Sequence, residues 1–252
     1  MMPPELDKTS ALFLDLDGTL LDIAATPELV VVPPELPELL TDLHHLLEGA
    51  IAVVTGRPLA VIDQLLAPFS GSAAGEHGVL LRYEDGTLEE MPAGLAVPEV
   101  WRASLAVATE WLPGVMLERK PHGCAMHYRL APEHCNEVWR LVRALVADDH
   151  PGFRLIPARE AVEIGPRAVS KGHAVERLMS QAPFAGRKPI FVGDDFTDEA
   201  GMTAARAFGG QGLRVAEVFN GEAGEVRAWL KREADLLGSR RAAGVPAAGP
   251  SS

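Results

Sequence analysis

Two aspartates at the end of a short apolar run constrain this sequence more than any other feature. Residues 11–14 (Ala-Leu-Phe-Leu) predict a strand buried on both faces, and Asp15 and Asp17 follow directly. Residues i and i+2 of a strand point to the same side, so the two carboxylates begin side by side. Because carboxylates leave water at a high cost unless a cation or hydrogen-bond donors receive them, we expect a positive group between them. The alternative is a strand that turns in water and leaves both acids solvated.

Strands and helices alternate on both sides of the middle of the chain. Near-continuous apolar strands separated by helices are typical of a parallel sheet with helices on both faces. The predicted fold is therefore α/β. The expected strands are residues 11–15, 50–54, 72–77, 189–192 and 213–218, and the expected helices are residues 35–47, 61–66, 171–179, 198–206 and 222–234.

The middle of the chain has a different pattern. Hairpins and helices follow one another there, which predicts a separate α+β module inserted into the core. We assign residues 1–78 and 166–238 to the core and residues 79–165 to the module. The module should contain hairpins at residues 78–91 and 115–129, helices at residues 100–112 and 133–148, and paired strands at residues 153–156 and 161–164. Residues 239–252, which end in Ala, Gly, Val, Pro and Ser, are expected to be disordered.

Charge and cysteine content exclude several classes of partner. The net charge of −12 argues against nucleic acid or an anionic membrane, so an anionic ligand needs a local cluster of cations or a metal. The sequence has no apolar run near 18 residues and no signal pattern in its first ten residues. Cys124 and Cys135 lack metal-site spacing and are expected to be free thiols. We expect a cytoplasmic protein without a membrane partner, with a monomer slightly favoured over an oligomer.

Polar residues follow three of the expected core strands, namely Asp15 with Asp17, Thr55, and Asp194. Ligands of open α/β sheets bind outside the carboxyl ends of the strands, so these side chains should meet if the strands are neighbours. The carboxylates of Asp15, Asp17 and Asp194 form an oxygen-only set that suits Mg²⁺.

Other residues extend this site. Asp198 lies in the first turn of the helix after Asp194, where it could hold a metal-bound water. Asp195 or Thr197 could take part in catalysis or could instead be a plain helix N-cap. Lys171 is at the N-terminus of an expected helix, where the macrodipole favours anions. One interpretation is that an anion binds between the lysine side chain and the helix N-terminus. The alternative is an ordinary surface lysine. Thr55 offers a hydroxyl to a phosphate.

Taken together, four ordered motifs resemble those of the haloacid dehalogenase-like (HAD) phosphatases: Asp15-Leu-Asp17-Gly-Thr, Thr55-Gly-Arg57, Lys171, and Gly193-Asp194-Asp195-Phe-Thr-Asp198. The resemblance implies a HAD-like Rossmannoid core with an inserted α+β cap, and a Mg²⁺-dependent phosphomonoesterase. Asp15 would be the nucleophile that forms an aspartyl-phosphate, and Asp17 the general acid and base. Asp15, Asp194 and the Asp17 carbonyl would bind Mg²⁺, supported by Asp195 and Asp198, while Thr55 and Lys171 hold phosphoryl oxygens.

Further motifs are similar to those of the trehalose-6-phosphate phosphatases: Gly75-Glu76-His77-Gly78, Glu118-Arg119-Lys120, His127-Tyr128-Arg129 and Val162-Glu163-Ile164. This similarity implies that Glu118, Lys120 and Glu163 contact the sugar and that Arg57 and His77 bind substrate. Gly165 departs from the pattern, since many members have lysine there. The implied reaction is hydrolysis of trehalose 6-phosphate, the last step of trehalose biosynthesis.

The residues alone leave alternatives open. Glu118 and Lys120 could equally form a solvated ion pair, and His127 and Tyr128 are expected to pack inside the cap. Other functions compatible with the motifs are hydrolysis of another sugar phosphate, phosphoryl transfer to a sugar, and non-catalytic binding of a sugar phosphate beside a synthase.

Overall fold

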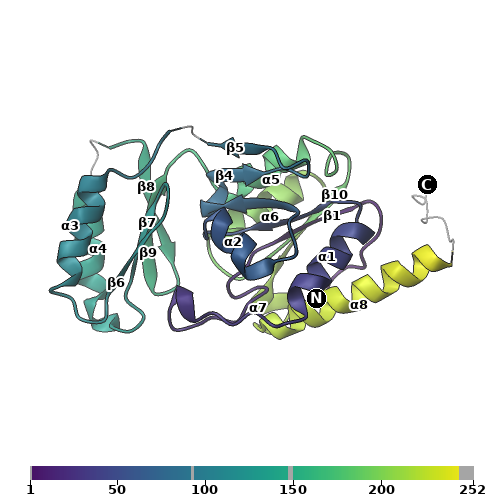
Figure 1. Ribbon diagram of the computed structural model, residues 1–252, viewed down its shortest axis with the longest axis horizontal. Helices are drawn as coiled ribbons and strands as arrows, with labels where there is room; N and C mark the ends of the chain where they lie inside the picture. The colour runs from purple at the N-terminus through teal and green to yellow at the C-terminus, as the bar shows by residue number, and fades with distance from the viewer. Residues whose placement is uncertain (1, 92–93, 147–149, 244–252) are drawn as a thin grey trace.

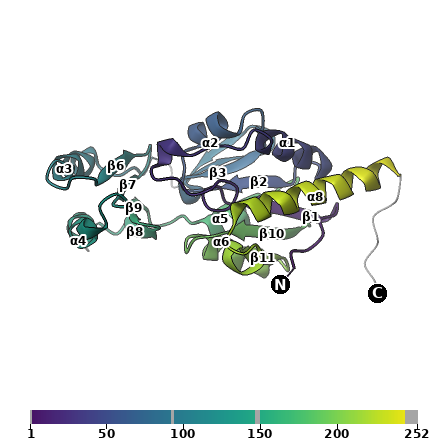
Figure 2. The same ribbon diagram turned by 90° about the horizontal axis from the view of Figure 1, so that it is seen from below.

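The computed structural model describes residues 2–91, 94–146 and 150–243, and it consists of two bodies side by side (Figure 1). The larger body is the core and the smaller one is the cap. The cap lies at one end of the core, with its two helices on the side away from the core (Figure 2). The predicted α/β class with an inserted α+β segment is confirmed.

A seven-stranded sheet with the order β11-β10-β1-β2-β3-β4-β5 forms the centre of the core. Five of its strands are parallel, and β4 and β5 are antiparallel additions at one edge. The strands are β1 (Ser10–Leu14), β2 (Ile51–Val54), β3 (Ser72–Gly75), β4 (Leu80–Arg82), β5 (Leu88–Glu90), β10 (Lys188–Gly193) and β11 (Gln211–Arg214).

Alternating side chains of β1 divide between two hydrophobic clusters, as expected for a sheet that is covered on both faces. Leu12 and Leu14 pack with α1 (Leu36–Leu46), α2 (Leu59–Leu66) and α8 (Ala223–Ala242). Ala11 and Phe13 pack on the other face with α5 (Lys171–Met179) and α6 (Asp198–Ala207). Burial on both faces explains why this strand is apolar up to the residue before Asp15.

The cap contains a four-stranded antiparallel sheet with the order β6-β7-β9-β8. Its hydrophobic cluster joins the sheet to the two helices and includes Trp101, Val138 and Val162. The cap elements are α3 (Glu99–Thr109), β6 (Met116–Arg119), β7 (Cys124–His127), α4 (Cys135–Leu145), β8 (Phe153–Ala158) and β9 (Ala161–Pro166). Two of the three strand pairs that the sequence predicts in the inserted module, those of residues 115–129 and 153–164, form this sheet.

Three predictions about elements are wrong. The hairpin β4–β5, placed in the inserted module with a boundary at residue 79, continues the core sheet because β4 pairs antiparallel with β3. The strand predicted over residues 213–218 ends at Arg214, and the short helix α7 (Val215–Val218) follows. Residues 239–242, predicted to be disordered, complete α8, whose apolar face continues to the buried Leu237. Residues 244–252 of the predicted tail lie outside the described residues.

Cys124 and Cys135 are free thiols, as predicted. Burial raises the pKa of the Cys124 thiol to about 11, so that this thiol stays protonated and behaves as an apolar core residue. The described helices include none with the length and apolar character that a membrane-spanning segment requires.

Candidate active site

The polar residues that follow three core strands meet at one edge of the sheet. Asp15 follows β1, which lies between β10 and β2, and Asp194 and Thr55 follow these two neighbours. The strands are parallel, so their carboxyl ends point the same way. Asp15 and Thr55 are almost fully buried, with exposed fractions of 4% and 2%.

Lys171 lies in the middle of the carboxylates, which decides against the reading of it as a surface lysine. Its Nζ donates to Asp15 Oδ1 and to Asp198 Oδ1, both at 2.6 Å, and the residue is buried. Ser170 caps the start of α5 by accepting from the backbone N–H of His173 at 3.2 Å. Burial alone would lower the pKa of Lys171, but the two carboxylates outweigh it and raise this pKa, so the ammonium is kept.

The carboxylates outnumber the cations at this point. Burial, and then the charge of Asp198, raise the pKa of Asp15 well above its usual range, although Lys171 opposes the shift. Burial, and then Asp198 and Asp195, raise the pKa of Asp194 to about 6. Since repulsion between carboxylates destabilises their ionised forms, the cluster favours an additional cation.

The arrangement of oxygens fits a magnesium ion. One carboxylate oxygen from each of Asp15, Asp194 and Asp198 lies within 4.8 Å of the others. Oδ1 of Asp194 is buried and has no hydrogen-bond partner among the described residues. Gly18, with φ +82°, makes room for Asp194, because a Cβ there would lie 2.2 Å from Asp194 Oδ2. Hard oxygen ligands of this kind are those that Mg²⁺ prefers.

Asp17 differs from its predicted place, because its carboxylate is not in this cluster. Both of its oxygens accept from Arg57, from Nε and from Nη2, each at 2.7 Å. Nη1 of Arg57 donates to the Pro27 carbonyl at 3.1 Å, and the backbone N–H of Arg57 donates to Thr55 Oγ1 at 3.3 Å. Burial lowers the pKa of Arg57, but Asp17 outweighs it and raises this pKa. Arg57, expected to bind substrate, holds the carboxylate of Asp17 here.

The remaining acids lie around the first turn of α6. Asp198, expected to hold a metal-bound water, instead binds Lys171 directly and also accepts from the backbone N–H of Asp195 at 3.0 Å through Oδ2. Thr197 occupies the N-cap position, but its side chain makes no capping bond within the described chain. Asp195 lines the cleft. The N-cap reading therefore fits Thr197 only by position, and does not fit Asp195.

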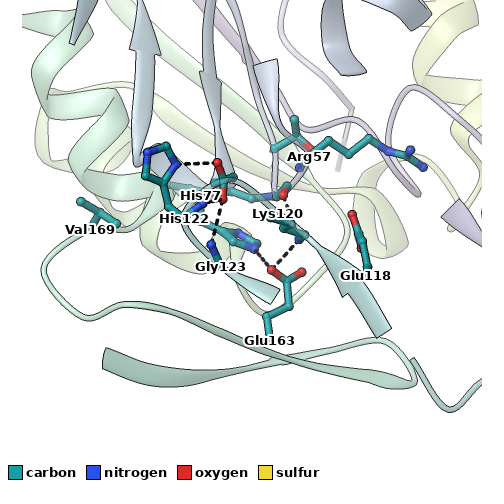
Figure 3. A network of polar contacts seen from close by, with 12 residues as sticks. Arg57, His77, Glu118, Lys120, His122, Gly123, Glu163 and Val169 are labelled. Atoms are coloured by element: carbon teal, nitrogen blue, oxygen red, sulfur yellow. Dashed lines mark hydrogen bonds and ion pairs between the residues drawn. The ribbon is translucent and has the colours of Figure 1, made fainter. Parts of the chain in front are cut away.

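A second polar network joins the cap to the core above this site (Figure 3). Nζ of Lys120 donates to Glu163 Oε2 at 2.6 Å and to the Gly56 carbonyl at 2.9 Å. His77 Nε2 lies 3.2 Å from the same Glu163 oxygen. Burial would raise the pKa of Glu163, but Lys120 and His77 outweigh it and hold this pKa well below its usual range. The alternative of a solvated Glu118–Lys120 pair is wrong, because Lys120 is buried and paired with Glu163.

Glu118 has a different partner, His127, whose Nε2 lies 2.9 Å from Glu118 Oε2. Burial would raise the pKa of Glu118, but His127 and then Lys120 lower it. His127 was expected to pack inside the cap, and this expectation is wrong. Glu118 pairs with Ala125 in the β6–β7 hairpin, so His127, two residues further on, lies diagonally beside it on the same face. The register of the hairpin is the signal that could have found His127.

A cleft between cap and core contains both networks. It has a volume of about 860 Å³, counted together with its open mouth. Arg129 of the cap, which stands in a motif but was given no role, also lines the cleft, and so does Arg159, which the sequence analysis missed. Arg129 reaches across to the core, where Nη1 donates to the Ala24 carbonyl. The motif His127-Tyr128-Arg129 places this arginine in the cap, but no feature of the sequence predicts its contact with Ala24.

Comparison with known proteins points to one family. The family model described as Trehalose-phosphatase matches residues 13–228. The chain is 43% identical over 205 residues to a probable trehalose-phosphate phosphatase of Sinorhizobium fredii, covering 81% of this chain and 77% of the relative. It is 36% identical over 212 residues to the trehalose-6-phosphate phosphatase of Escherichia coli, covering 84% and 79%.

The fold has solved counterparts. The C-terminal domain of the C. albicans trehalose-6-phosphate phosphatase superposes with a TM-score of 0.75 at 19% identity. The match covers 90% of this chain and 92% of that domain. At this identity the likeness concerns the fold alone.

Proposed function

The chain belongs to the trehalose-phosphatase family, and from this premise we propose that it hydrolyses trehalose 6-phosphate to trehalose and phosphate through an aspartyl-phosphate on Asp15. One observation carries the proposal. Asp15 and Lys171 of the core, which Asp198 holds from behind, line the same cleft as Lys120 and Glu163 of the cap. The first can act on a phosphate, and the second can receive a sugar.

Asp15 is the proposed nucleophile. A carboxylate oxygen of Asp15 bonds to phosphorus as the bond from phosphorus to the sugar oxygen breaks, which gives the aspartyl-phosphate. Lys171, whose ammonium is held beside Asp15, neutralises charge on the phosphoryl oxygens, and Thr55 offers its hydroxyl to them. Positioning and charge stabilisation supply most of the acceleration in phosphoryl transfer.

Asp17 is the proposed acid and base. It gives a proton to the departing sugar oxygen and later takes a proton from the water that attacks phosphorus and releases Asp15. Arg57 holds Asp17 at the edge of the cleft through two hydrogen bonds. Arg57 therefore sets the resting orientation of the carboxylate.

Asp15, Asp194 and the backbone carbonyl of Asp17 are proposed to hold Mg²⁺, with Asp198 close behind. The ion would supply positive charge for the phosphate and for the crowded carboxylates. The unpartnered Asp194 Oδ1 supports this assignment.

The cap is proposed to select the sugar. Glu118, Lys120 and Glu163 offer charge-assisted hydrogen bonds to sugar hydroxyls, with His77 and His127 beside them.

Two free thiols fit a reducing compartment, and we place the reaction in the cytoplasm.

The experiment that tests the proposal measures phosphate release from trehalose 6-phosphate with Mg²⁺ and with EDTA. Chelation is expected to reduce the rate by at least about 100-fold, because charge stabilisation by the ion is worth several kcal/mol. Addition of excess Mg²⁺ should restore it. A rate in EDTA equal to that in Mg²⁺ would remove the metal from the mechanism, and absence of release in both would remove the activity.

Glu118→Ala is expected to weaken recognition of the sugar and to spare the chemistry. A hydrogen bond to a charged group contributes about 1.5–3 kcal/mol, so KM for trehalose 6-phosphate should rise by about 10- to 100-fold. p-Nitrophenyl phosphate has no sugar that Glu118 could contact. Its KM should therefore stay within about twofold of the wild-type value. Glu133→Ala, at an exposed glutamate of the cap, is the control. Equal changes on both substrates would place Glu118 outside the sugar site.

A further inference from the structure

A buried glutamate of the core, Glu76, holds the turn that joins β6 and β7 in the cap. Its Oε2 accepts from the backbone N–H groups of His122 at 2.9 Å and Gly123 at 3.2 Å. Its Oε1 lies 2.8 Å from His122 Nδ1. The contact therefore crosses from one body to the other, and it does not belong to either network of the proposed active site.

The carbonyl side of the same turn is held from within the cap. Nη2 of Arg102, on α3, donates to the carbonyls of Lys120 and Pro121, each at 3.0 Å. The backbone N–H of Val97 donates to the carbonyl of His122 at 2.9 Å. A turn whose N–H and C=O groups are all engaged has little freedom to change shape, so it places Lys120, its first residue, at a fixed point relative to Glu76.

Close packing adds to this rigidity at Gly123. A Cβ on this residue would lie 2.8 Å from the Ile164 carbonyl oxygen, so only glycine allows β9 to approach the turn. The turn is thus packed against β9, the strand that carries Glu163, and is bonded to the carboxylate of Glu76.

The backbone around Glu76 is strained. Glu76 and His77 have φ values of 48° and 60°, in the left-handed region that side chains with a Cβ rarely adopt. Residues in this conformation are unfavourable, and they persist where the surroundings hold them. Here the N–H of Glu76 donates to the Arg57 carbonyl at 3.0 Å, and the N–H of His77 donates to the Thr55 carbonyl at 2.9 Å. The strained segment is therefore bonded on one side to the loop proposed to hold the phosphate, and on the other side to the cap.

Glu76 also lies where the chain passes between the two bodies. A small cavity is lined by Glu76, Gly123 and the segment that leaves the cap, including Gly165, Pro166 and Val169. The segment that enters the cap passes the same turn, because Val97 bonds to His122. Glu76 thus lies beside both segments that connect the cap to the core.

We propose that Glu76 is a positioning residue for substrate selection: it fixes the turn that presents Lys120 over the Thr55–Arg57 loop, and so sets the distance between the sugar site and the phosphate site. This inference rests on the proposed function, since it assigns the cap residues to the sugar. Glu76 touches neither sugar nor phosphate in this role. It acts through Lys120, whose Nζ reaches the Gly56 carbonyl.

Glu76→Gln tests the proposal with a side chain of the same size. The amide oxygen can still accept from the turn, but the negative charge is gone, so the contacts with the two backbone N–H groups and with His122 are no longer charge-assisted. We expect kcat/KM for trehalose 6-phosphate to fall by about 10-fold or more, mainly through KM, as for a misplaced charged hydrogen bond. For p-nitrophenyl phosphate, kcat/KM should stay within about twofold.

The matched control is Glu90→Gln. Glu90 lies on the outer side of His122, with 3.3 Å between His122 Nε2 and Glu90 Oε1, and it is more exposed than Glu76. This variant should leave the ratio of the two kcat/KM values unchanged. His122→Ala removes the contacts of the imidazole with Glu76 and Glu90, keeps the Glu76 carboxylate and its two backbone bonds, and should shift the ratio in the same direction by a smaller factor. If Glu76→Gln does not fold, His122→Ala tests the proposal in its place.

An unchanged ratio in folded Glu76→Gln, or an equal loss on both substrates with a lowered Tm, would overturn the proposal. The wild-type protein in the same assay reports separately on the proposed function. If it hydrolyses the aryl phosphate but not trehalose 6-phosphate, the substrate assignment fails, and the ratio test of Glu76 is repeated with the sugar ester that it does hydrolyse.

Discussion

Replacing Asp15 with asparagine is expected to abolish turnover of trehalose 6-phosphate and of p-nitrophenyl phosphate alike. The amide cannot attack phosphorus, so the loss should reach about 10⁴-fold or more, as for other nucleophiles that act as part of a unit. Asparagine has the same shape and keeps one carbonyl oxygen for Lys171, whose second partner, Asp198, is unchanged. The fold should therefore survive the substitution.

Phosphate release and thermal unfolding of Asp15→Asn are the two measurements. Asp235→Asn, at an exposed aspartate on α8, is the control for a generic loss of one carboxylate. Folded Asp15→Asn with a rate within tenfold of the wild type would exclude Asp15 as the nucleophile. Loss of activity together with loss of folding would call for a second variant, Asp15→Glu, which keeps the charge but moves the oxygens.

Lys171→Met is expected to have the largest effect on stability. It removes the ammonium between Asp15 and Asp198 and leaves two buried carboxylates without their cation. Removal of one partner from a buried ion pair costs about 3–5 kcal/mol of unfolding free energy. Methionine fills nearly the same volume, so the loss comes from charge and not from a cavity.

The pH dependence of this loss follows from the direction of the pKa shift. Burial already raises the pKa of Asp15 well above its usual range, and Lys171→Met removes the charge and the hydrogen bond of Lys171, which oppose that shift. A folded state with a raised carboxyl pKa binds protons more tightly than the unfolded state, so its relative stability rises as the pH falls. The deficit of Lys171→Met against the wild type should therefore shrink between pH 8 and pH 5.

Urea unfolding at both pH values measures this difference. Lys231→Met, at an exposed position of α8, is the matched control and should change the unfolding free energy by no more than about 0.5 kcal/mol. A deficit below about 1 kcal/mol for Lys171→Met, in the range of a surface pair, would mean that the ammonium does not hold the carboxylates together.

Local patterns in the sequence predicted the elements that position the chemistry. The run before Asp15 is apolar because β1 is buried on both faces, and the helix beginning at Lys171 has a serine cap directly before it. The meeting of Asp15, Thr55 and Asp194 followed from a general rule for parallel sheets, since the sequence itself does not state which strands are neighbours.

The sequence could not predict which residues far apart in the chain pair with each other. Asp17 and Arg57 are 40 residues apart, and either side chain could satisfy its charge in water. Lys120 lies near Glu118 in sequence, but binds Glu163 because β7 and β9 are neighbours in the cap sheet. The β4–β5 hairpin was recognised as a hairpin, but its own residues do not say which sheet edge it joins. In each case the fold, and not local preference, selects the partner.

A substrate panel tests the central claim most directly. Phosphate release with Mg²⁺ would be measured from trehalose 6-phosphate, sucrose 6-phosphate, glucose 6-phosphate and p-nitrophenyl phosphate, at equal enzyme concentrations. The structure and the family predict the highest kcat/KM for trehalose 6-phosphate, by about 100-fold over the other sugar esters if two charged hydrogen bonds of the cap discriminate between them. A higher kcat/KM for another sugar ester would contradict the assignment of the cap, and release from none of the four would contradict the catalytic role of the whole cleft.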